Sequence, residues 1–378
     1  MSNYKSLSRR KFLGKSGLLL TGMNISAISK IQASQSTFFE NDEVPLIHAT
    51  DLYHTHGDPD DHWDLASIYS LAFTKDINLK GILIDFPPKR RLGDPDVMGV
   101  AQLNYITGMP ISTIIGTPYP MEHRNDVQSY ASKIDHQGIQ WVIDTLKKSP
   151  TPVVINIVGA ATDIAVAAKK EPNLFHEKCR SIYLNAGSAN NGKDNKLEFN
   201  VKLNPSAFAA IFDIDCPIYW LPCWNETEIH EVGEYGSYFR FLQNDILPHL
   251  PDRLQNYFLF MLGQKKSHKW LNYLINDVEH DLLEYYNKMN RNMWCIAGFL
   301  YAAGKKVTCN GEIVSLHSKE KSVFSFIPID VNANDDGFTQ WQLDTTSQKR
   351  YIFHVDDIEN YQTAMTIALK NLLLNLPK

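Results

Sequence analysis

The sequence lacks the features that mark nucleic-acid-binding and membrane-spanning proteins. Its 37 lysines and arginines are outnumbered by 42 aspartates and glutamates, and the net charge of −5 with a pI near 6.2 gives no basic field for nucleic acid. After the amino terminus, no segment approaches the roughly twenty uninterrupted apolar residues of a membrane helix. There is no internal repeat and no low-complexity tract. The 378 residues, 44% of them hydrophobic, suit one large α/β domain or two smaller ones.

Cysteine is also scarce, and its spacing excludes a thiolate metal site. The five cysteines lie far apart and form no Cys-x-x-Cys pair. Buried free thiols are therefore expected, even where export would permit disulfides. The cysteines are Cys179, Cys216, Cys223, Cys295 and Cys309.

The amino terminus has the pattern of an export signal. Arg9 and Arg10 precede an apolar run through Leu18–Met23 and then small residues, which resembles a twin-arginine signal peptide. An amphipathic amino-terminal helix is the alternative. We expect an exported, periplasmic protein. A lipid anchor is not expected, because the signal zone has no cysteine. The expected organisation is a signal peptide over 1–33, a linker over 34–44 and a single domain over 45–378.

Strand-like and helix-like segments alternate from residue 46 to residue 221. Alternation of short apolar runs with helical stretches of about ten to fifteen residues predicts βαβ units, and so an open, mostly parallel α/β sheet flanked by helices. The expected strands are Leu46–Thr50, Leu79–Phe86, Ile111–Ile115, Pro152–Val158, Ser181–Asn185 and Pro217–Leu221. The expected helices are Asp61–Phe73, Asp96–Thr107, Val127–Lys148, Ala161–Lys169 and Pro205–Phe212.

From about Glu231 the pattern changes to helical additions rich in aromatic residues. A β-hairpin region is expected over Val307–Asp330, and a closing helix follows His354 and ends near Leu376. The other expected helices are Tyr238–Leu247, Arg253–Leu262, Trp270–Asn287 and Met293–Ala303.

The most chemically loaded stretch follows the first expected strand. Crowded carboxylates repel one another and shift their pKa values upward unless a cation neutralises them, so the stretch predicts a metal site. Carboxylate oxygens favour Ca²⁺ or Mg²⁺, whereas the interleaved histidines leave a transition metal open. A solvated acidic loop is the plain alternative. The residues are Asp51, Asp58, Asp60, Asp61 and Asp64, with His54, His56 and His62.

Several polar and glycine positions fall at the carboxyl ends of expected strands. Asp51, Asp85, Gly159 and Gly187 all stand at or just past such ends. In open α/β sheets the ligand sits outside these ends. We therefore expect the acidic loop and the two glycine turns to converge on one crevice.

Four segments in the same order resemble the inosine-uridine nucleoside hydrolase family. The amino-terminal aspartate cluster is similar to the family's Asp-Thr-Asp and Asp-x-Asp-Asp motif, with an insertion around Tyr53 to His56. The later segments look like the family's Gly-Pro-Leu-Thr-Asn-Ile-Ala, Met-Gly-Gly-Ala and Ala-Glu-Phe-Asn motifs. The four segments are 50–71, 158–165, 184–188 and 197–207.

The resemblance implies the fold of that family, hydrolysis of an N-ribosyl or related glycosidic bond, and a Ca²⁺ ion. Carried over by position, Asp51 and Asp61 are calcium ligands together with the backbone carbonyl of Thr162. Asp51 is also the general base, so that it and the metal activate water. The implied sugar contacts are Asp60, Asn185, Glu198, Asn200 and either Asn190 or Asn191, of which Asn191 is preferred. The implied partner is a small nucleoside-like molecule, and a homo-oligomer is expected.

Plainer interpretations exist for several of these residues. Thr162 could only cap the following helix, since threonine does this routinely. Glu198 and Asn200 could be surface turn residues, and Asp85 and Asn185 could equally belong to turns.

The chain departs from the family where a late His-Asp pair is expected, because Asn292 and Met293 stand there. Three explanations follow from the sequence. Asp58 or a water supplies the missing calcium ligand; His54, His56 or His62 supplies a proton or a metal ligand; or the protein binds a sugar compound with little turnover. Trp294, beside the altered positions, is either a stacking partner for the leaving group or a core residue.

A second enzyme class shares part of the histidine-rich turn. His54-Thr-His56-Gly-Asp58 begins like the zinc motif of the metallo-β-lactamase superfamily. Pro59 stands where that motif needs its third histidine, which makes a zinc hydrolase the weaker alternative.

Overall fold

The computed structural model describes residues 43–55, 59–85, 93–193, 196–226 and 230–378. The expected signal peptide and almost all of the linker, together with His56 and Asp58, lie outside the described residues. None of the helices in the described ranges is long and apolar enough to cross a membrane.

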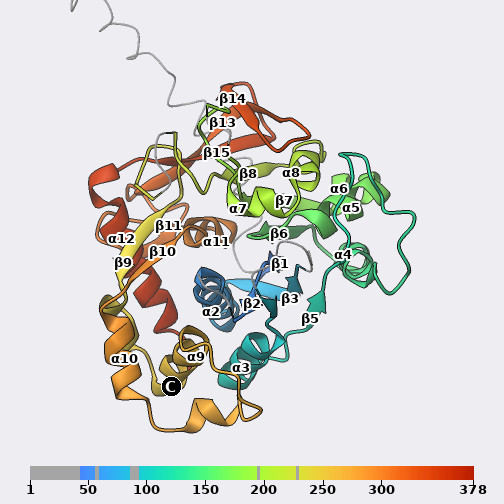
Figure 1. Cartoon of the computed structure of the whole chain (residues 1–378). Helices are drawn as coiled ribbons and strands as arrows, with labels where there is room; N and C mark the ends of the chain where they lie inside the picture. Colours follow the sequence, from blue (N-terminus) through green and yellow to red (C-terminus); the bar gives the residue numbers. More distant parts are fainter. Residues whose placement is uncertain (1–42, 56–58, 86–92, 194–195, 227–229) are drawn as a thin grey trace, which may run out of the picture. The chain divides into compact units, whose positions relative to one another are not determined.

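A nine-stranded sheet runs through the middle of the molecule, in the order β14-β13-β15-β8-β7-β6-β1-β3-β5 (Figure 1). Every pairing from β15 to β5 is parallel, whereas β13 pairs antiparallel with β15 and β14. The predicted mostly parallel α/β fold is therefore confirmed. The strands are β1 Val44–Thr50, β3 Ile77–Ile84, β5 Thr113–Ile115, β6 Val153–Ile157, β7 Cys179–Asn185, β8 Ile218–Leu221, β13 Phe324–Ala333, β14 Thr339–Leu343 and β15 Arg350–Val355.

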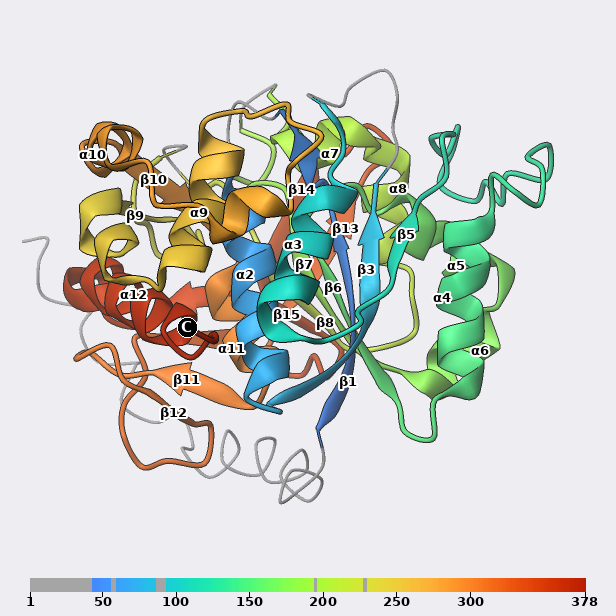
Figure 2. The same cartoon turned by 90° about the horizontal axis from the view of Figure 1, so that it is seen from below.

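Helices cover both faces of this sheet (Figures 1 and 2). One face carries α2 Asp60–Phe73, α3 Val97–Thr107, α11 Ile296–Ala302 and α12 Ile358–Leu373. The other carries α4 Gln137–Lys148, α5 Thr162–Lys170, α6 Pro172–Lys178 and α8 Pro205–Ile211. Beyond the first face lie α9 Asp252–Leu262 and α10 His280–Asn287.

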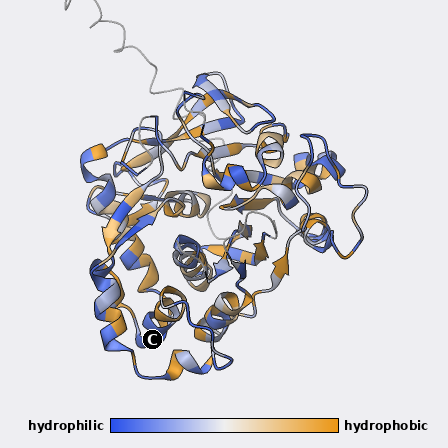
Figure 3. Ribbon diagram, in the orientation of Figure 1, coloured by the Kyte–Doolittle hydropathy of each residue, from blue (hydrophilic) through white to orange (hydrophobic). Residues whose placement is uncertain are grey.

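The central strands are apolar on both sides because helices cover both sheet faces. All residues of β1 and of β6 are buried. In Figure 3 the strands in the middle carry hydrophobic residues, whereas the outer loops are mostly hydrophilic. Because the strands are buried along their length, polar side chains can meet only where the strands end, at the edge of the sheet.

Helix α2 is buried from its first turn onward, although it begins with two aspartates. Residues 61 to 71 are all buried. Trp63 stacks on Phe258 of α9 with ring centroids 4.1 Å apart and meets Phe241 edge-on at 5.2 Å. The helical additions therefore hold α2 against the sheet, and with it the acidic residues at its start.

Several predicted element boundaries were wrong. The helix expected over Val127–Lys148 begins only at Gln137, because Asp126 and Asp135 bind the amides of Gln128 and Ser132 in turns. In place of the helices expected over Trp270–Asn287 and Met293–Ala303, the chain forms a 3-10 turn, Asn272–Ile275, then α10, and later α11 from Ile296.

The segment expected as a helix over Tyr238–Leu247 is a short strand, β9 Phe239–Leu242, followed by 3-10 turns. Its residues are alternately buried and exposed, which is the period of a strand, and it pairs antiparallel with β10 Asn290–Met293. The expected hairpin region contains the antiparallel pair β11 Lys305–Val307 and β12 Ile313–Ser315, and then β13. All five cysteines are free, but Cys309 is exposed.

A buried histidine in β1 makes stability depend on pH. His48 is fully buried, contacts Phe299 edge-on at 5.4 Å, and has no hydrogen-bond partner among the described residues. Burial lowers the pKa of His48 from 6.5 to about 3. The unfolded chain therefore binds one more proton than the folded chain between these values, and stability falls as pH falls through this window.

We expect His48→Leu to remove this part of the acid sensitivity. The wild type should lose about 2 kcal/mol more of unfolding free energy than the variant between pH 7 and pH 5. Urea unfolding at a series of pH values measures the difference. The exposed His317 serves as control, because His317→Leu should leave the pH dependence of the wild type unchanged. Parallel pH curves for wild type and His48→Leu would contradict the prediction.

Candidate active site

The carboxyl ends of adjacent parallel strands bring the acidic residues to one sheet edge. Asp51 follows β1. Asp85 follows β3, the neighbour of β1 on one side, and the Gly159 turn follows β6, its neighbour on the other side. Asp61 comes from the first turn of α2, where its Oδ1 accepts a 2.8 Å hydrogen bond from the Thr50 hydroxyl. Asp51, Asp61 and Asp85 are buried, with 3%, 6% and 2% of their surfaces exposed.

The turn after β6 packs its backbone directly against these aspartates. The amide of Ala160 donates to Asp85 Oδ2. A Cβ atom added at Gly159 would lie 2.5 Å from the Asp51 nitrogen and 2.9 Å from the Asp51 Cβ. Only glycine fits this close approach, so Gly159 allows the ends of β1, β3 and β6 to share one small volume.

Burial and mutual repulsion raise the pKa values of all three carboxyls. For Asp51 the largest cause is burial, followed by the charges of Asp85 and Asp60, and a hydrogen bond with Asp61 offsets part of the effect. For Asp61 burial again leads, followed by the charges of Asp51 and Asp64. Asp85 is raised by burial and by the charge of Asp163. A bound cation would relieve this repulsion, and the oxygen-rich donor set fits a hard divalent ion.

Asp51, Asp61 and Asp85 form one wall of the candidate site, which we call the acidic wall, and polar residues after β7 form a second wall. Glu198 caps α7 Phe199–Leu203 by accepting hydrogen bonds from the amides of Asn200 and Val201 at 2.9 and 3.3 Å, and it also accepts one from Gly187 at 2.9 Å. Burial raises the pKa of Glu198, and these amide hydrogen bonds oppose the shift. Glu198 is thus a buried acceptor with a fixed orientation, in place of the surface turn residue of the plainer interpretation.

Asn200 and Asn185 join this wall to the strand ends. The Asn200 amide donates to the carbonyls of Val158 and Asn185, both at 3.0 Å. The side chain of Asn185 is buried and donates to Ser237 Oγ at 3.3 Å and to the Trp294 carbonyl at 3.4 Å. The amide oxygens of both residues have further acceptor capacity.

Both walls act on one buried thiol. Burial raises the pKa of Cys223, and the charges of Glu198, Asp60 and Asp51 raise it further. The two walls are joined through Asn200, whose side-chain amide donates to the carbonyl of Val158, next to the Gly159 turn that packs on Asp51.

The remaining residues predicted from the resemblance have different positions. Thr162 is the first residue of α5, its hydroxyl accepts a hydrogen bond from Asn204 at 3.0 Å, and it makes no capping bond. Asp60, half-buried, begins α2. Asn190 is buried, whereas the Asn191 side chain accepts a 2.7 Å hydrogen bond from the Trp341 amide.

The loop after β7 is held by β14 along its length. Besides the contact to Asn191, Trp341 Nε1 donates to the Ala189 carbonyl at 3.0 Å, and the Thr339 hydroxyl donates to the Ser188 carbonyl at 2.9 Å. The antiparallel edge of the sheet therefore fixes the rim of the second wall.

An aromatic group borders the second wall. The half-buried Trp294 donates from Nε1 to the Cys223 carbonyl at 2.9 Å, and its ring lies 5.6 Å from Tyr238 and 6.1 Å from His230. Tyr238 in turn donates to Asn292 Oδ1 at 3.0 Å, one of the two positions where the family pattern is altered. Sequence reasoning missed Tyr238 and His230, because nothing in their local pattern links them to Trp294.

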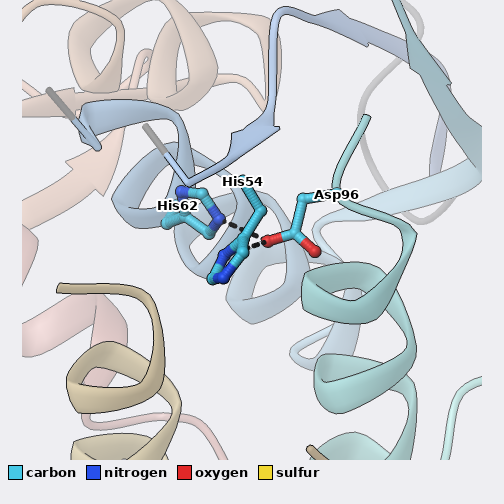
Figure 4. A group of neighbouring side chains, drawn as sticks. All are labelled: His54, His62 and Asp96. Carbon is cyan, nitrogen blue, oxygen red and sulfur yellow. Dashed lines mark hydrogen bonds and ion pairs between the residues drawn. The ribbon is translucent and has the colours of Figure 1, made fainter. Parts of the chain in front are cut away.

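Two histidines of the acidic stretch, His54 and His62, belong to another group of side chains. His54 and His62 both face Asp96, the residue that precedes α3 (Figure 4). The charges acting on His54 are those of Asp96 and Lys266, and none of the three aspartates of the acidic wall is among them. Sequence reasoning missed Asp96 as their partner.

Comparison with known proteins places the chain among nucleoside hydrolases. Residues 92–363 match the family model described as inosine-uridine preferring nucleoside hydrolase. The match begins after the acidic stretch, so it bears on the second wall and the aromatic group, whereas Asp51 and Asp61 lie outside it.

Two curated relatives are described as pyrimidine-specific ribonucleoside hydrolase RihA. The protein from Citrobacter koseri is 27% identical over 136 residues, which are 35% of this chain and 41% of the relative. The protein from Salmonella arizonae is also 27% identical over 136 residues, 35% of this chain and 42% of the relative. The chain thus spans less than half of the length of these relatives.

Solved structures share the fold. A purine-preferring ribonucleoside hydrolase from Gardnerella vaginalis has a TM-score of 0.50 at 15% identity, covering 87% of this chain and 99% of that one. The effector protein XOO4466 has a TM-score of 0.52 at 11% identity, covering 92% and 98%.

The close approach at Gly159 can be tested by a single methyl group. Gly159→Ala should destabilise the fold by about 1–3 kcal/mol, because the new Cβ overlaps the Asp51 backbone. Thermal unfolding measures the loss. Gly192→Asn is the control, since the nearest atom to its added Cβ is 3.9 Å away and asparagine tolerates its positive φ. Equal unfolding midpoints for both variants would show that the approach is looser than described.

Proposed function

The chain belongs to the inosine-uridine preferring nucleoside hydrolase family, and from this premise we propose that it hydrolyses the N-ribosyl bond of a nucleoside or a related glycosidic bond with a bound divalent cation. The observation that carries the proposal is the convergence of buried Asp51, Asp61 and Asp85 at one sheet edge beside Glu198 and its hydrogen-bonded loop.

Asp51 and Asp61 would hold the cation, with the Thr162 carbonyl and Asp58 as further oxygen donors. The donors are oxygens, so calcium is the proposed ion. When bound, the ion supplies positive charge that lowers the pKa of water and orients hydroxyl groups. The raised pKa values of Asp51 and Asp61, caused first by burial and then by neighbouring carboxylates, support this assignment, because a bound cation would favour the charged form of both groups.

Asp51 is the proposed general base. Its carboxylate takes a proton from the attacking water, whose oxygen forms the new bond to the anomeric carbon. The bond between the sugar and its aglycone breaks, and the aglycone leaves with the electron pair. A positioned carboxylate base contributes about 10²- to 10⁴-fold to such a step.

The second wall would hold the sugar. Its acceptors are Glu198 and the amide oxygens of Asn185, Asn191 and Asn200, with Asp60 on the opposite side. Ribosyl transfer passes through an oxocarbenium-like state, and hydrogen bonds to the ring hydroxyls strengthen as positive charge develops. The fixed orientation of Glu198 supports this role, since a held acceptor costs little reorganisation.

The aromatic group would bind the leaving base. Trp294 and His230 offer ring faces beside the buried Tyr238, and the Trp294 carbonyl contacts Asn185. This favours a flat aromatic aglycone, in keeping with the pyrimidine-specific and purine-preferring descriptions of the relatives. His54 and His56 are not needed in this proposal.

The proposal extends to the setting of the enzyme. The Arg9-Arg10 segment supports export to the periplasm, and the family resemblance supports a homo-oligomer acting on free nucleosides. A binding protein without turnover remains the second candidate, on the observation that Asn292 and Met293 replace the family's His-Asp pair.

Metal removal and a single substitution test the hydrolase together. Chelation should abolish release of ribose from uridine and inosine, and added Ca²⁺ should restore it. Asp51→Asn should lower kcat by about 10²- to 10⁴-fold through loss of the base. Asp144→Asn, on the exposed side of α4, is the matched control and should keep full activity. Ribose release is measured by a reducing-sugar assay.

A protein that binds nucleosides without hydrolysing them would give a different result. Calorimetry that detects uridine binding to the wild type, with no ribose released in the presence of Ca²⁺, would contradict hydrolysis and support binding alone.

The aromatic group can be tested through the Michaelis constant. Trp294→Ala should raise KM for uridine by about 3- to 10-fold, the loss expected for one aromatic stacking contact. Trp294→Phe, which keeps a ring, should lie between the wild type and the alanine variant. An unchanged KM in both variants would show that Trp294 is only a packing residue.

A further inference from the structure

Three buried side chains from separate elements meet at one carboxylate oxygen. His54 ends β2 Tyr53–His54, His62 lies in the first turn of α2, and Asp96 precedes α3 (Figure 4). Asp96 Oδ2 lies 2.8 Å from His62 Nε2 and 3.4 Å from His54 Nδ1. The side chains of His62, His54 and Asp96 are 1%, 6% and 2% exposed, respectively. We call them the His54–His62–Asp96 group.

Hydrogen bonds fix which ring nitrogen of His54 carries the proton. Its Nε2 lies 2.7 Å from the Lys265 carbonyl, which can only accept, so Nε2 is the donor. In the neutral ring Nδ1 is then a lone pair, and it is directed at another lone pair on Asp96 Oδ2. This Nδ1 has no hydrogen-bond partner among the described residues. A cation between the two atoms, either a proton or a metal ion, would turn their repulsion into attraction.

The arrangement around His54 is that of a metal ligand. Histidines that bind metals usually donate their other ring N–H to a carbonyl or carboxylate, which fixes the ring. Here the Lys265 carbonyl does this, and the Phe260 ring stacks on His54 at 5.5 Å. Asp96 is held likewise, since its Oδ1 accepts a 3.0 Å hydrogen bond from the Gly99 amide while Oδ2 faces the histidines.

We propose that His54 Nδ1, His62 Nε2 and Asp96 Oδ2 form a binding site for a divalent transition-metal ion of the zinc class, separate from the oxygen-lined site at Asp51 and Asp61. One ligand atom from each residue lies within 4.8 Å of the others. Two imidazoles and one carboxylate suit zinc and its neighbours, whereas calcium prefers an all-oxygen shell.

Two of the three separations between the ligand atoms are close to those of a tetrahedral site. Tetrahedral bonds of about 2.0–2.1 Å place ligand atoms about 3.3 Å apart. The 3.4 Å separation of His54 Nδ1 from Asp96 Oδ2 already matches, and the 2.8 Å separation from His62 Nε2 needs about 0.5 Å more. To bind the ion through Nε2, the neutral ring of His62 carries its proton on Nδ1, which is buried and has no hydrogen-bond partner among the described residues.

The ion would connect three elements near the acidic wall. His62 follows Asp61 directly in α2. His54 ends β2, which pairs with β4 Asp94–Pro95, and Asp96 lies between β4 and α3. A bound ion would therefore stabilise the turn of α2 that carries Asp60 and Asp61. The site stands whether or not the chain hydrolyses nucleosides.

Zinc binding by the full chain tests the site. Protein freed of metal by chelation is titrated with Zn²⁺ in excess Ca²⁺, which occupies the oxygen-lined site, and binding is followed by calorimetry. Wild type and Asp61→Asn should each bind one zinc ion per chain. The double variant His54→Gln/His62→Gln should bind more than about 100-fold more weakly, since even loss of a supporting hydrogen bond costs 10- to 100-fold.

Two further measurements on the wild type keep the test decisive if the double variant does not fold. Zn²⁺ should raise the thermal unfolding midpoint by about 3 °C or more at saturating concentration. X-ray absorption of the zinc-loaded protein should show imidazole ligands. Equal zinc affinity in the wild type and the double variant, or a zinc spectrum without imidazole, would overturn the site. None of these measurements uses nucleoside turnover. Failure of the zinc-site proposal can therefore be distinguished from failure of the hydrolase proposal.

Discussion

The repulsion between Asp51, Asp61 and Asp85 is the constraint around which the rest of the structure is arranged. Three buried carboxyls within mutual electrostatic reach raise one another's pKa values, and a fold keeps such a group only where surrounding contacts hold it in place. Thr50 and Ala160 donate hydrogen bonds to two of them. The parallel strands supply the position, because their carboxyl ends lie at one edge.

The second wall meets a different requirement, that of holding polar groups still. Glu198 is both the cap of α7 and the acceptor for the Gly187 amide, and Asn200 ties the ends of β6 and β7 together. The same hydrogen bonds that stabilise the loop therefore orient the groups proposed to contact the sugar. The same hydrogen bonds therefore provide both the stability of the loop and the preorganisation of the proposed sugar-binding groups.

The sequence was sufficient for what depends on local pattern. The apolar runs gave the strands, and the aspartates and glycines that follow them lie at one edge because parallel strands require it. The sequence was insufficient for contacts between residues that are far apart in the chain. His54 contacts the Lys265 carbonyl 211 residues away, which no local pattern indicates. In β9, Phe239 and Phe241 are buried whereas Arg240 and Leu242 are exposed. An alternation over four residues, in a segment rich in aromatic residues, is too short to identify a strand from the sequence.

The hold of β14 on the loop after β7 has a consequence for how the protein is made. Ser188, Ala189 and Asn191 are anchored by Thr339 and Trp341, about 150 residues later in the chain. During synthesis the carboxyl-terminal strands leave the ribosome long after the parallel core has begun to form. The rim of the second wall is therefore completed late, and a nascent chain that ends before residue 339 lacks these three hydrogen bonds.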